Sequence, residues 1–382
     1  MPDYIVKPYD VLFFRGNKSF HFGQWYSQGV FPPYPSTFQG FVRHKILDDH
    51  GLINKQGRLT DPEKAKEMIG DDEGLGKINI TGPYLMDSET IYFKSPMDLF
   101  REGSSYCSAF PLSEETLESD CKLNLSCPNL PEGKLDNLCP PEIISLEELS
   151  GYRTSLEGID VKGSEPVKPE ERVGIGMNND NGNRMVQRRR FYVTPYNRLE
   201  KNVGLYCHVS GEKMKDGALK LGSESHLTYV EELSSSFMLE EELAKTRDSL
   251  IDNIEETGNF RMILLQPGVF KKGWLPFEQE EVNDLKLKLL FAFTKAPIRI
   301  SGYSYQKKAA DQKGIRLKPL VNTVPAGAVY MFKILNKPGR EQIKDFVDSF
   351  DNKKIEHRPY SRMGFNHVIL GAGRKIKGGE YA

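Results

Sequence analysis

Alternation of hydrophobic and polar residues predicts the elements of the N-terminal part of the chain. The run at 4–15 carries apolar residues on odd positions, which is typical of a strand. Over 36–50, apolar residues recur every four positions behind an S-x-x-Q capping box, and this pattern predicts a helix. Short alternating runs follow at 77–80 and 90–94. The opening order is strand, helix, strand, strand, the first two-thirds of a ferredoxin-like unit.

The middle of the chain has weaker periodicity. Residues 102–182 are rich in Pro, Gly, Ser and acids and poor in regularly spaced apolar residues, so a long irregular segment is expected. Residues 173–193 predict a β-hairpin, because Asn181 and Gly182 form the Asn-Gly pair that favours a tight turn. Further short strands are expected at 188–194, 204–209 and 226–230.

The C-terminal third has clearer patterns. The expected elements are a strand at 260–265, a helix over 282–293, strands at 298–301 and 328–335, a helix over 343–350 and a last strand at 365–370. The first helix is inferred because Val282, Leu285, Leu289 and Phe293 would share one helix face. The resulting order, βαββαβ, is again that of a ferredoxin-like module.

These elements predict an α+β fold of two ferredoxin-like modules with a long irregular middle segment and a projecting β-hairpin. The N-terminal module is expected to span 1–210 and to include an acidic insertion and the arginine-rich hairpin. The C-terminal module is expected to span 211–382 and to contain a glycine-rich loop. A chain of 382 residues fits two modules, because it exceeds the usual size of one hydrophobic core.

Composition narrows the cellular setting. With 38% hydrophobic and 27% charged residues, and no apolar run near the roughly 20 residues of a bilayer crossing, no membrane partner is expected. The first residues lack the basic and then apolar layout of a secretory signal, and five cysteines cannot all pair within one chain. A reducing, cytoplasmic location is expected.

Four cysteines lie in the irregular segment, at Cys107, Cys121, Cys127 and Cys139. A zinc site could hold such a segment together, but the spacing C-x13-C-x5-C-x11-C lacks the short C-x2-C or C-x4-C pairs of zinc sites. Free thiols are the favoured interpretation, and we expect no metal and no cofactor.

Charge is segregated although the formal net charge is only −1. Residues 112–180 carry fifteen acids against six bases, whereas 181–199 carry five arginines and no acid. The stretch 353–377 has seven Lys or Arg against one acid. Solvated faces commonly carry such runs, but clustered cations are also what phosphate binding requires.

Three sets of residues resemble a known family. The first is YDVLFFRG at 9–16 with FPPYPSTFQGFVR at 31–43, the second is LKLGSESHLTYV at 219–230, and the third is RISGY at 299–303, VPAGAVY at 324–330 and MGFNHVILGAG at 363–373. No single stretch is specific, but their order and spacing resemble the RAMP proteins of the Cmr subunit-three family of type III-B CRISPR effector complexes. The pattern departs from that family at Ser223, where a second glycine is more usual.

The resemblance implies two packed ferredoxin-like domains and a non-catalytic subunit at the 5′ end of the guide RNA. Its implied partners are the guide (CRISPR) RNA, the large polymerase-like subunit and neighbouring RAMP subunits. A hairpin in this position acts as a thumb in the RAMP group. No residue is expected to be catalytic.

Candidate RNA-binding residues come from three regions. Helix N-termini and glycine loops offer N–H groups to phosphate, arginines add charge, and aromatic rings stack on unpaired bases. The candidates are Arg15, Lys18, His21, Ser36, Thr37, Gly40, Arg43, Arg184, Arg188, Arg189, Arg190, Phe191, Tyr192, Gly364, Gly371, Gly373 and Arg374.

Each of these regions also has an explanation that does not involve RNA binding. Ser36 and Thr37 could simply cap a helix, the glycines could form an ordinary turn, and the hairpin could be a sheet edge. His21 could act as the acid or base of a metal-independent guide-processing endoribonuclease, but no partner residue follows it at a recognisable spacing. A third alternative is a scaffold that does not itself touch RNA.

Overall fold

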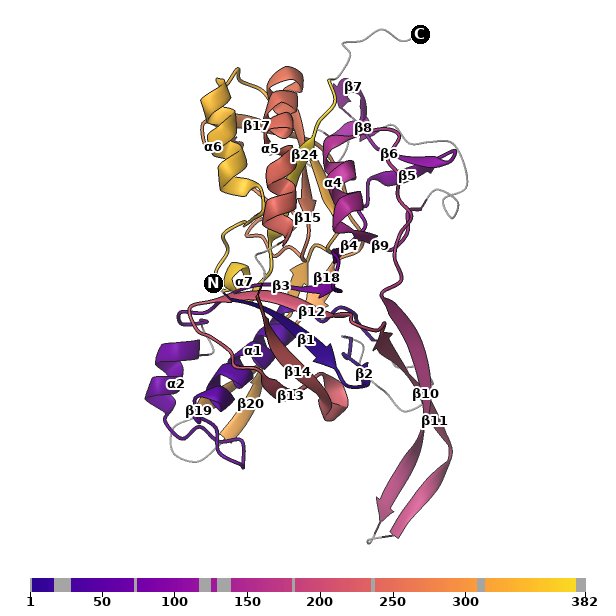
Figure 1. Ribbon diagram of the computed structural model, residues 1–382, viewed down its shortest axis with the longest axis vertical. Coiled ribbons are helices and arrows are strands. Elements are labelled where there is room, and N and C mark those ends of the chain that lie inside the picture. Colours follow the sequence, from indigo (N-terminus) through magenta and orange to yellow (C-terminus); the bar gives the residue numbers. More distant parts are fainter. Residues whose placement is uncertain are drawn as a thin grey trace. The chain divides into compact units, whose positions relative to one another are not determined.

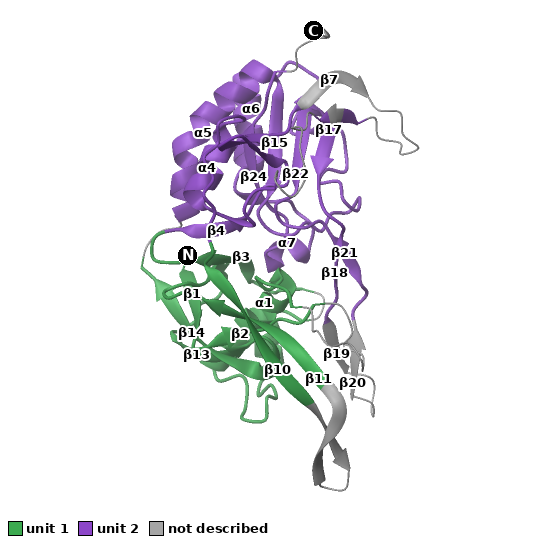
Figure 2. Ribbon diagram, turned by 90° about the vertical axis from the view of Figure 1, so that its right-hand side faces the viewer, with its two compact units in different colours: residues 1–89, 165–234 green, residues 90–164, 235–382 purple. Residues whose placement is uncertain are grey.

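The computed structural model describes residues 2–16, 29–71, 74–116, 125–128, 139–180, 183–234, 238–307 and 313–375. The chain forms two compact units, each built from two separate segments (Figure 2). Unit 1 comprises 1–89 and 165–234, and unit 2 comprises 90–164 and 235–382. These bounds differ from the expected division at residue 210, because the chain passes between the units three times.

Unit 1 is an antiparallel sheet with helix α1 on one face (Figure 1). Its elements are β1 (Asp3–Pro8), β2 (Val11–Leu12), α1 (Pro35–Asp49), α2 (Pro62–Ile69), β3 (Asn79–Met86), β10 (Val167–Asp180), β11 (Asn183–Leu199), β12 (Gly204–Ser210), β13 (Gly217–Leu221), the 3₁₀ turn Ser223–Ser225 and β14 (His226–Leu233). Within the unit the strands lie in the order β13-β14-β1-β12-β3. Phe38, Val42 and Ile46 of α1 are fully buried, as their four-residue recurrence predicts.

The start of α1 differs from the expected capping box. Tyr34 occupies the N-cap position and Pro35 the first turn, and no side chain caps the helix. Proline suits this place because it lacks the N–H group that the first turn leaves unpaired. Gln39 donates instead to the Ser36 carbonyl at 3.1 Å.

Unit 2 is a six-stranded antiparallel sheet between two layers. Its elements are β4 (Ile91–Lys94), β5 (Leu99–Glu102), β6 (Ser105–Ser108), β7 (Pro111–Thr116), β8 (Ser126–Pro128), β9 (Ile143–Ser145), α4 (Leu146–Thr154), α5 (Met238–Thr257), β15 (Asn259–Leu264), β16 (Glu281–Val282), β17 (Leu285–Phe293), β18 (Ile298–Ile300), β19 (Tyr303–Lys307), β20 (Lys313–Leu317), β21 (Val321–Thr323), β22 (Val329–Ile334), α6 (Arg340–Phe350), β23 (Lys353–Lys354), α7 (Tyr360–Met363) and β24 (His367–Ala372). The sheet order is β16-β17-β22-β15-β24-β23. Helices α5 and α6 bury their apolar sides on one face of this sheet.

The segment 90–164, which includes part of the stretch 102–182 that was expected to be irregular, covers part of the other face of this sheet. Helix α4 begins at a complete capping box in which Ser145 and Glu148 exchange hydrogen bonds. Its C-terminal end lies over β24, where the Arg153 carbonyl approaches Gly371. The expectation of a long irregular segment at 102–182 was therefore wrong for most of its described residues, since β6, β7, β8, β9, α4 and β10 are all regular.

The helix expected over 282–293 is a strand, β17. Leu285 and Leu287 are buried while Lys286 between them is exposed, which is the two-residue period of a strand. A register shift between Leu289 and Phe291 then resets the alternation. This bulge makes apolar residues recur at spacings that imitate a helix face.

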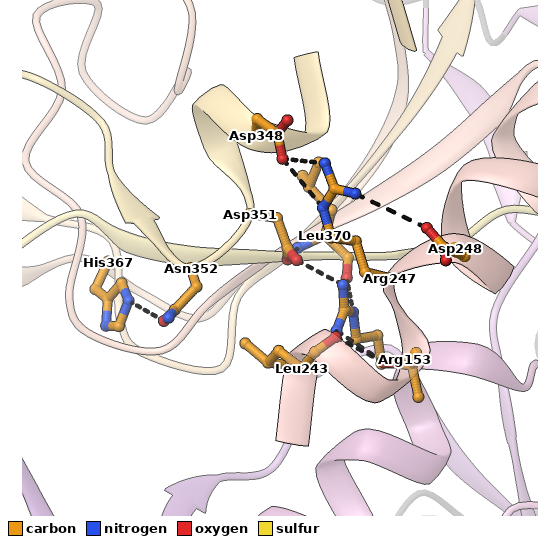
Figure 3. Close-up of polar contacts among 10 residues, drawn as sticks. Arg153, Leu243, Arg247, Asp248, Asp348, Asp351, Asn352, His367 and Leu370 are labelled. Atoms are coloured by element: carbon orange, nitrogen blue, oxygen red, sulfur yellow. Dashed lines mark hydrogen bonds and ion pairs between the residues drawn. The ribbon is translucent and has the colours of Figure 1, made fainter. Parts of the chain in front are cut away.

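Two buried arginines join the two segments of unit 2, and Figure 3 shows the first of them, Arg153. Arg153 of α4 has no exposed surface and donates to the Leu370 and Leu243 carbonyls and to Thr246 Oγ1, each at 2.9 Å. Its remaining nitrogen donates to Asp351 Oδ2 at 2.5 Å. One side chain thus ties α4 to α5, to β24 and to the end of α6.

A second buried arginine serves the neighbouring part of this face. Arg261 of β15 donates to Ser108 Oγ and to the Tyr152 carbonyl, both at 2.8 Å, and lies 3.7 Å from Asp98 Oδ2. Asp98 also accepts hydrogen bonds from Tyr152 and Ser108, both at 2.5 Å. Every charge in this cluster therefore has hydrogen-bonding partners, as a buried charge requires.

His367 gives unit 2 a pH-dependent stability. The ring is 1% exposed, and its Nε2 lies 2.9 Å from Asn352 Oδ1 (Figure 3). Burial lowers the pKa of His367 to about 3. Since only the unfolded chain takes up this proton below pH 6.5, stability is complete above that pH and falls by up to about 1.4 kcal/mol per unit as the pH drops towards 3.

We expect a His367→Gln variant to lose this part of the pH dependence. Urea unfolding at pH 7.0, 6.0 and 5.0 measures it, with His44→Gln as the control because His44 is an exposed residue of α1. An equal slope in His367→Gln and the native chain would contradict the assignment.

Candidate nucleic-acid interface

The arginine-rich hairpin predicted from the sequence is present, and it is longer than expected. Strands β10 and β11 pair from Val167 with Leu199 to Asp180 with Asn183, and project as a two-stranded ribbon (Figure 1). The register shifts between the pairs Ile175–Phe191 and Met177–Val186. Residues 187–190 therefore stand opposite Gly176 alone, so the backbone of the three consecutive arginines forms a bulge.

A bulge is a common place for functional side chains, because it interrupts the alternation of a strand and re-aims the residues within it. The backbone of Arg184 lies beyond this bulge, paired with Asn179. Next to the bulge, Phe191 is 53% exposed. The Tyr192 ring lies over Gly174, where a Cβ would come within 3.0 Å of it.

The base of the hairpin carries an ion network that sequence reasoning missed. Arg172 and Arg198 both donate to Asp10, at 3.1 and 2.9 Å, and both donate to Glu170. These hydrogen bonds lower the pKa values of Asp10 and Glu170. Two acids thus neutralise two arginines at the base. The sequence signal was an arginine in each of the two strands near the base of the hairpin, Arg172 and Arg198.

An aromatic cluster lies beside this network. The Arg172 guanidinium lies 4.9 Å from the Tyr196 ring centroid, and the Tyr196 hydroxyl donates to Glu224. Burial and this carboxylate raise the pKa of Tyr196 to about 12. Glu224 belongs to the glycine and glutamate stretch at 219–230, which therefore supports the base of the hairpin.

The start of α1 places its candidates on an accessible surface. Thr37 and Gly40 are exposed, and Ser36 and Arg43 are partly exposed. A Cβ on Gly40 would meet no atom within 4 Å, so neither packing nor a turn within the chain requires glycine there. Arg43 donates to the Asp71 carbonyl at 3.0 Å, which directs its guanidinium towards the loop after α2.

The expected glycine-rich loop is not an exposed loop. Gly364 has a φ of +112° and ends α7, whereas Gly371 lies within β24. Both glycines are buried, and so is Gly373. The Gly373 N–H group donates to Asn253 Oδ1 at 2.8 Å. At Gly371 and Gly373 the missing side chain admits the Arg153 carbonyl and the backbone of Asn259. The expectation was wrong because close backbone packing also selects glycine.

The remaining candidates are dispersed. Arg374 is held within unit 2, where its guanidinium bonds Glu157 and lies 4.1 Å from the Phe110 ring centroid. Arg15 is exposed and bridges to Gly29. Lys18 and His21 lie outside the described residues. The hairpin and the start of α1 therefore remain the accessible candidate surfaces.

Metal chemistry has no candidate centre in the part of the chain that the structure describes. No group of three or more His, Cys, Asp or Glu side chains could hold a metal ion there. Burial raises the pKa of Cys107 to about 11, and Cys139 is exposed. Cys121 and the side chain of Cys127 lie outside this part. Across the same residues, no helix has the length and apolar character of a membrane span.

The comparison with solved structures returned chains of low sequence identity. Two come from type III-B Cmr-beta complexes bound to cognate target RNA, one of them also with AMPPnP; both are 14% identical, with TM-scores of 0.48 and 0.49. The alignments cover 96% of this chain and 96% of the first, and 98% and 99% for the second. A chain of a Csm3–Csm4 subcomplex is 12% identical, with a TM-score of 0.34 over 86% of this chain and 92% of that one.

One of the two sequence comparisons identified a family. A search of curated proteins returned no significant match. The family model described as CRISPR-associated protein (Cas_Cmr3) matches residues 4–372, almost the whole chain. It includes the first two stretches on which the resemblance was based, and the third as far as residue 372. The chain therefore belongs to the Cmr3 family of CRISPR-associated proteins.

Proposed function

We propose that this chain is a non-catalytic subunit of a type III-B CRISPR effector complex that binds the 5′ tag region of the guide RNA. It would dock against the large polymerase-like subunit and neighbouring RAMP subunits. The observation that carries the proposal is the long hairpin with three consecutive arginines on a bulge, in a chain that the Cmr3 family model matches from residue 4 to 372.

We further propose that both units derive from ferredoxin-like modules. In unit 1, the strands β1, β3, β12 and β14 lie in the order fourth, first, third, second. In unit 2, β15, β17, β22 and β24 have the same order. Each described module has one helix of the expected βαββαβ pair, α1 in unit 1 and α6 in unit 2. The shared order supports a common ancestry for the two units.

The hairpin bulge is the proposed phosphate-binding surface. Residues 181–199 carry no acid that could neutralise its arginines from within the strand, unlike the base, where Asp10 and Glu170 engage Arg172 and Arg198. Phe191 adjoins the bulge and is exposed enough to contact an unpaired base. The start of α1, with Thr37, Gly40 and Arg43, is the second proposed contact.

The test is the salt dependence of guide RNA binding by the chain with its large partner subunit. The Arg188, Arg189 and Arg190 triple alanine variant should bind more weakly, and its salt slope should fall by about 2, since each phosphate contact to a single strand contributes about 0.7. A matched control replaces exposed arginines of unit 2, Arg101, Arg299 and Arg340. Equal effects in both variants would show unspecific attraction and contradict the hairpin assignment.

Two other functions give different outcomes. A guide-processing endoribonuclease would cleave repeat RNA without metal, and the cleavage would disappear in His21→Ala. A scaffold without RNA contacts would lose assembly, but not RNA affinity, when the hairpin arginines are replaced. Either result would overturn the proposed function.

A further inference from the structure

The sheet of unit 1 has one face that helix α1 does not cover, and aromatic residues are exposed on it. The pairing of β1 and β13 with β14 shows which side chains lie on this face. Tyr229 of β14 is opposite Lys7 of β1 and Ala218 of β13. Val230, the next residue, is fully buried and points to the α1 side.

A second row of side chains continues the same face. Leu227 is opposite Lys220, and the Tyr9 N–H group donates to the Leu227 carbonyl at 3.1 Å, which extends the β1–β14 ladder. Tyr9 is 64% exposed, Leu227 46% and Tyr229 37%. Exposed strand positions are usually polar, so three large apolar residues in two adjacent rows are unusual for a solvated face.

The geometry of this face suits unpaired nucleotides. Tyr9 and Tyr229 are diagonal neighbours on adjacent strands, a placement that separates side chains by roughly 7–8 Å and keeps both rings within reach of one ligand. The small side chain of Ala218 leaves one flank of Tyr229 open. Aromatic rings on an open sheet face are a common platform for bases of single-stranded RNA.

Charge on the face favours RNA over an apolar protein partner. Lys7 and Lys220 flank the two tyrosines, and Glu231, in the next row of the same face, is engaged by Lys7 at 2.8 Å. The face also adjoins the hairpin, since Tyr9 precedes Asp10, which bonds Arg172 and Arg198 at the hairpin base. A strand bound at the hairpin could therefore continue onto these residues.

We infer that Tyr9, Leu227 and Tyr229, with Lys7 and Lys220, form a second binding platform that stacks one or two unpaired nucleotides of a single-stranded RNA. This inference rests on the proposed RNA-binding function and adds a site that is separate from the hairpin. The two tyrosines stack on bases, and Lys220 contacts a phosphate.

The test measures binding of guide RNA by the full chain with its large partner subunit. Tyr229→Leu should weaken binding about 5- to 100-fold with an unchanged salt slope, because stacking involves no phosphate. Tyr229→Phe keeps the ring and should bind nearly as tightly as the native chain. Lys220→Ala should instead reduce the salt slope by about 0.7. Leu335→Ala, an exposed apolar residue of unit 2, is the control and should have no effect.

Photo-crosslinking with 4-thiouridine in the same RNA then locates the contact. Crosslinks at Tyr9 or Tyr229 are expected, and they should persist in the Arg188, Arg189 and Arg190 triple alanine variant at saturating RNA. Native affinity in Tyr229→Leu, with crosslinks only elsewhere, would overturn the platform and leave the proposed function intact. Absence of RNA binding by the native chain and its partner would overturn both. Loss of subunit assembly without loss of RNA affinity in Tyr229→Leu would show a protein-docking face and also overturn the inference.

Discussion

Replacement of Arg153 by methionine is expected to lower the free energy of unfolding by about 3–5 kcal/mol, because it leaves Asp351 buried without its cation. Asp351 Oδ1 still accepts the Leu370 N–H group at 2.9 Å, but Oδ2 loses the guanidinium. Urea unfolding followed by circular dichroism at pH 7 measures the change. Methionine retains most of the apolar stem of arginine, so loss of packing contributes little.

The matched control is Arg247→Met. Arg247 of α5 also bonds an aspartate of the α6 region, Asp348, but that pair is near the surface (Figure 3). Exposed ion pairs contribute no more than about 1 kcal/mol, so a small effect is expected. Burial already raises the pKa of Asp351, and without Arg153 the carboxyl should take up a proton, so the deficit should shrink at pH 4. An equal loss in both variants, or no change with pH, would argue against an unpaired buried charge.

A Gly373→Ala variant is expected to lower the free energy of unfolding by about 1–3 kcal/mol, since the new methyl group would overlap backbone atoms of Asn259. Backbone cannot move aside as a flexible side chain can. Thermal unfolding of the full chain measures the loss.

Gly40→Ala is the control with the opposite sign. Its methyl group would enter open space in the middle of α1, so alanine should stabilise the helix by up to about 1 kcal/mol. If Gly373→Ala were as stable as the native chain, close packing would not be the reason for glycine there. If Gly40→Ala weakened RNA binding while raising stability, the open space at Gly40 would be a contact with RNA.

These two glycines show why the role of a glycine could not be predicted from the sequence. A glycine indicates only that a side chain is unfavourable, and not whether a turn, a ligand or a neighbouring backbone is the cause. At Gly373 the cause is Asn259, which is more than one hundred residues away in the sequence. Local patterns hold no information on such a contact.

Elements with a clean period were predicted well. The α1 and α6 helices, the β15, β22 and β24 strands and the hairpin were all expected close to their observed positions. Helix α5 was missed because its buried residues, Leu239, Leu243, Leu250, Ile251 and Ile254, leave a polar gap in the middle of an acidic sequence. Strand β17 was mistaken for a helix because of its bulge. Both errors arise where tertiary packing overrides a local period.

The segmented construction of the units has a consequence for synthesis on the ribosome. Residues 90–164 emerge first, but the strands that they cover in unit 2, β15, β22 and β24, are completed only at residue 372. At 5–20 residues per second, this segment waits on the order of 10 to 40 seconds without its partners. Arg153, which is buried in the finished protein, lacks its partners Leu243, Asp351 and Leu370 until those residues are made. A nascent chain of this kind is exposed to chaperones and proteases until its last strand is made, so premature termination leaves a fragment whose unit 2 cannot form.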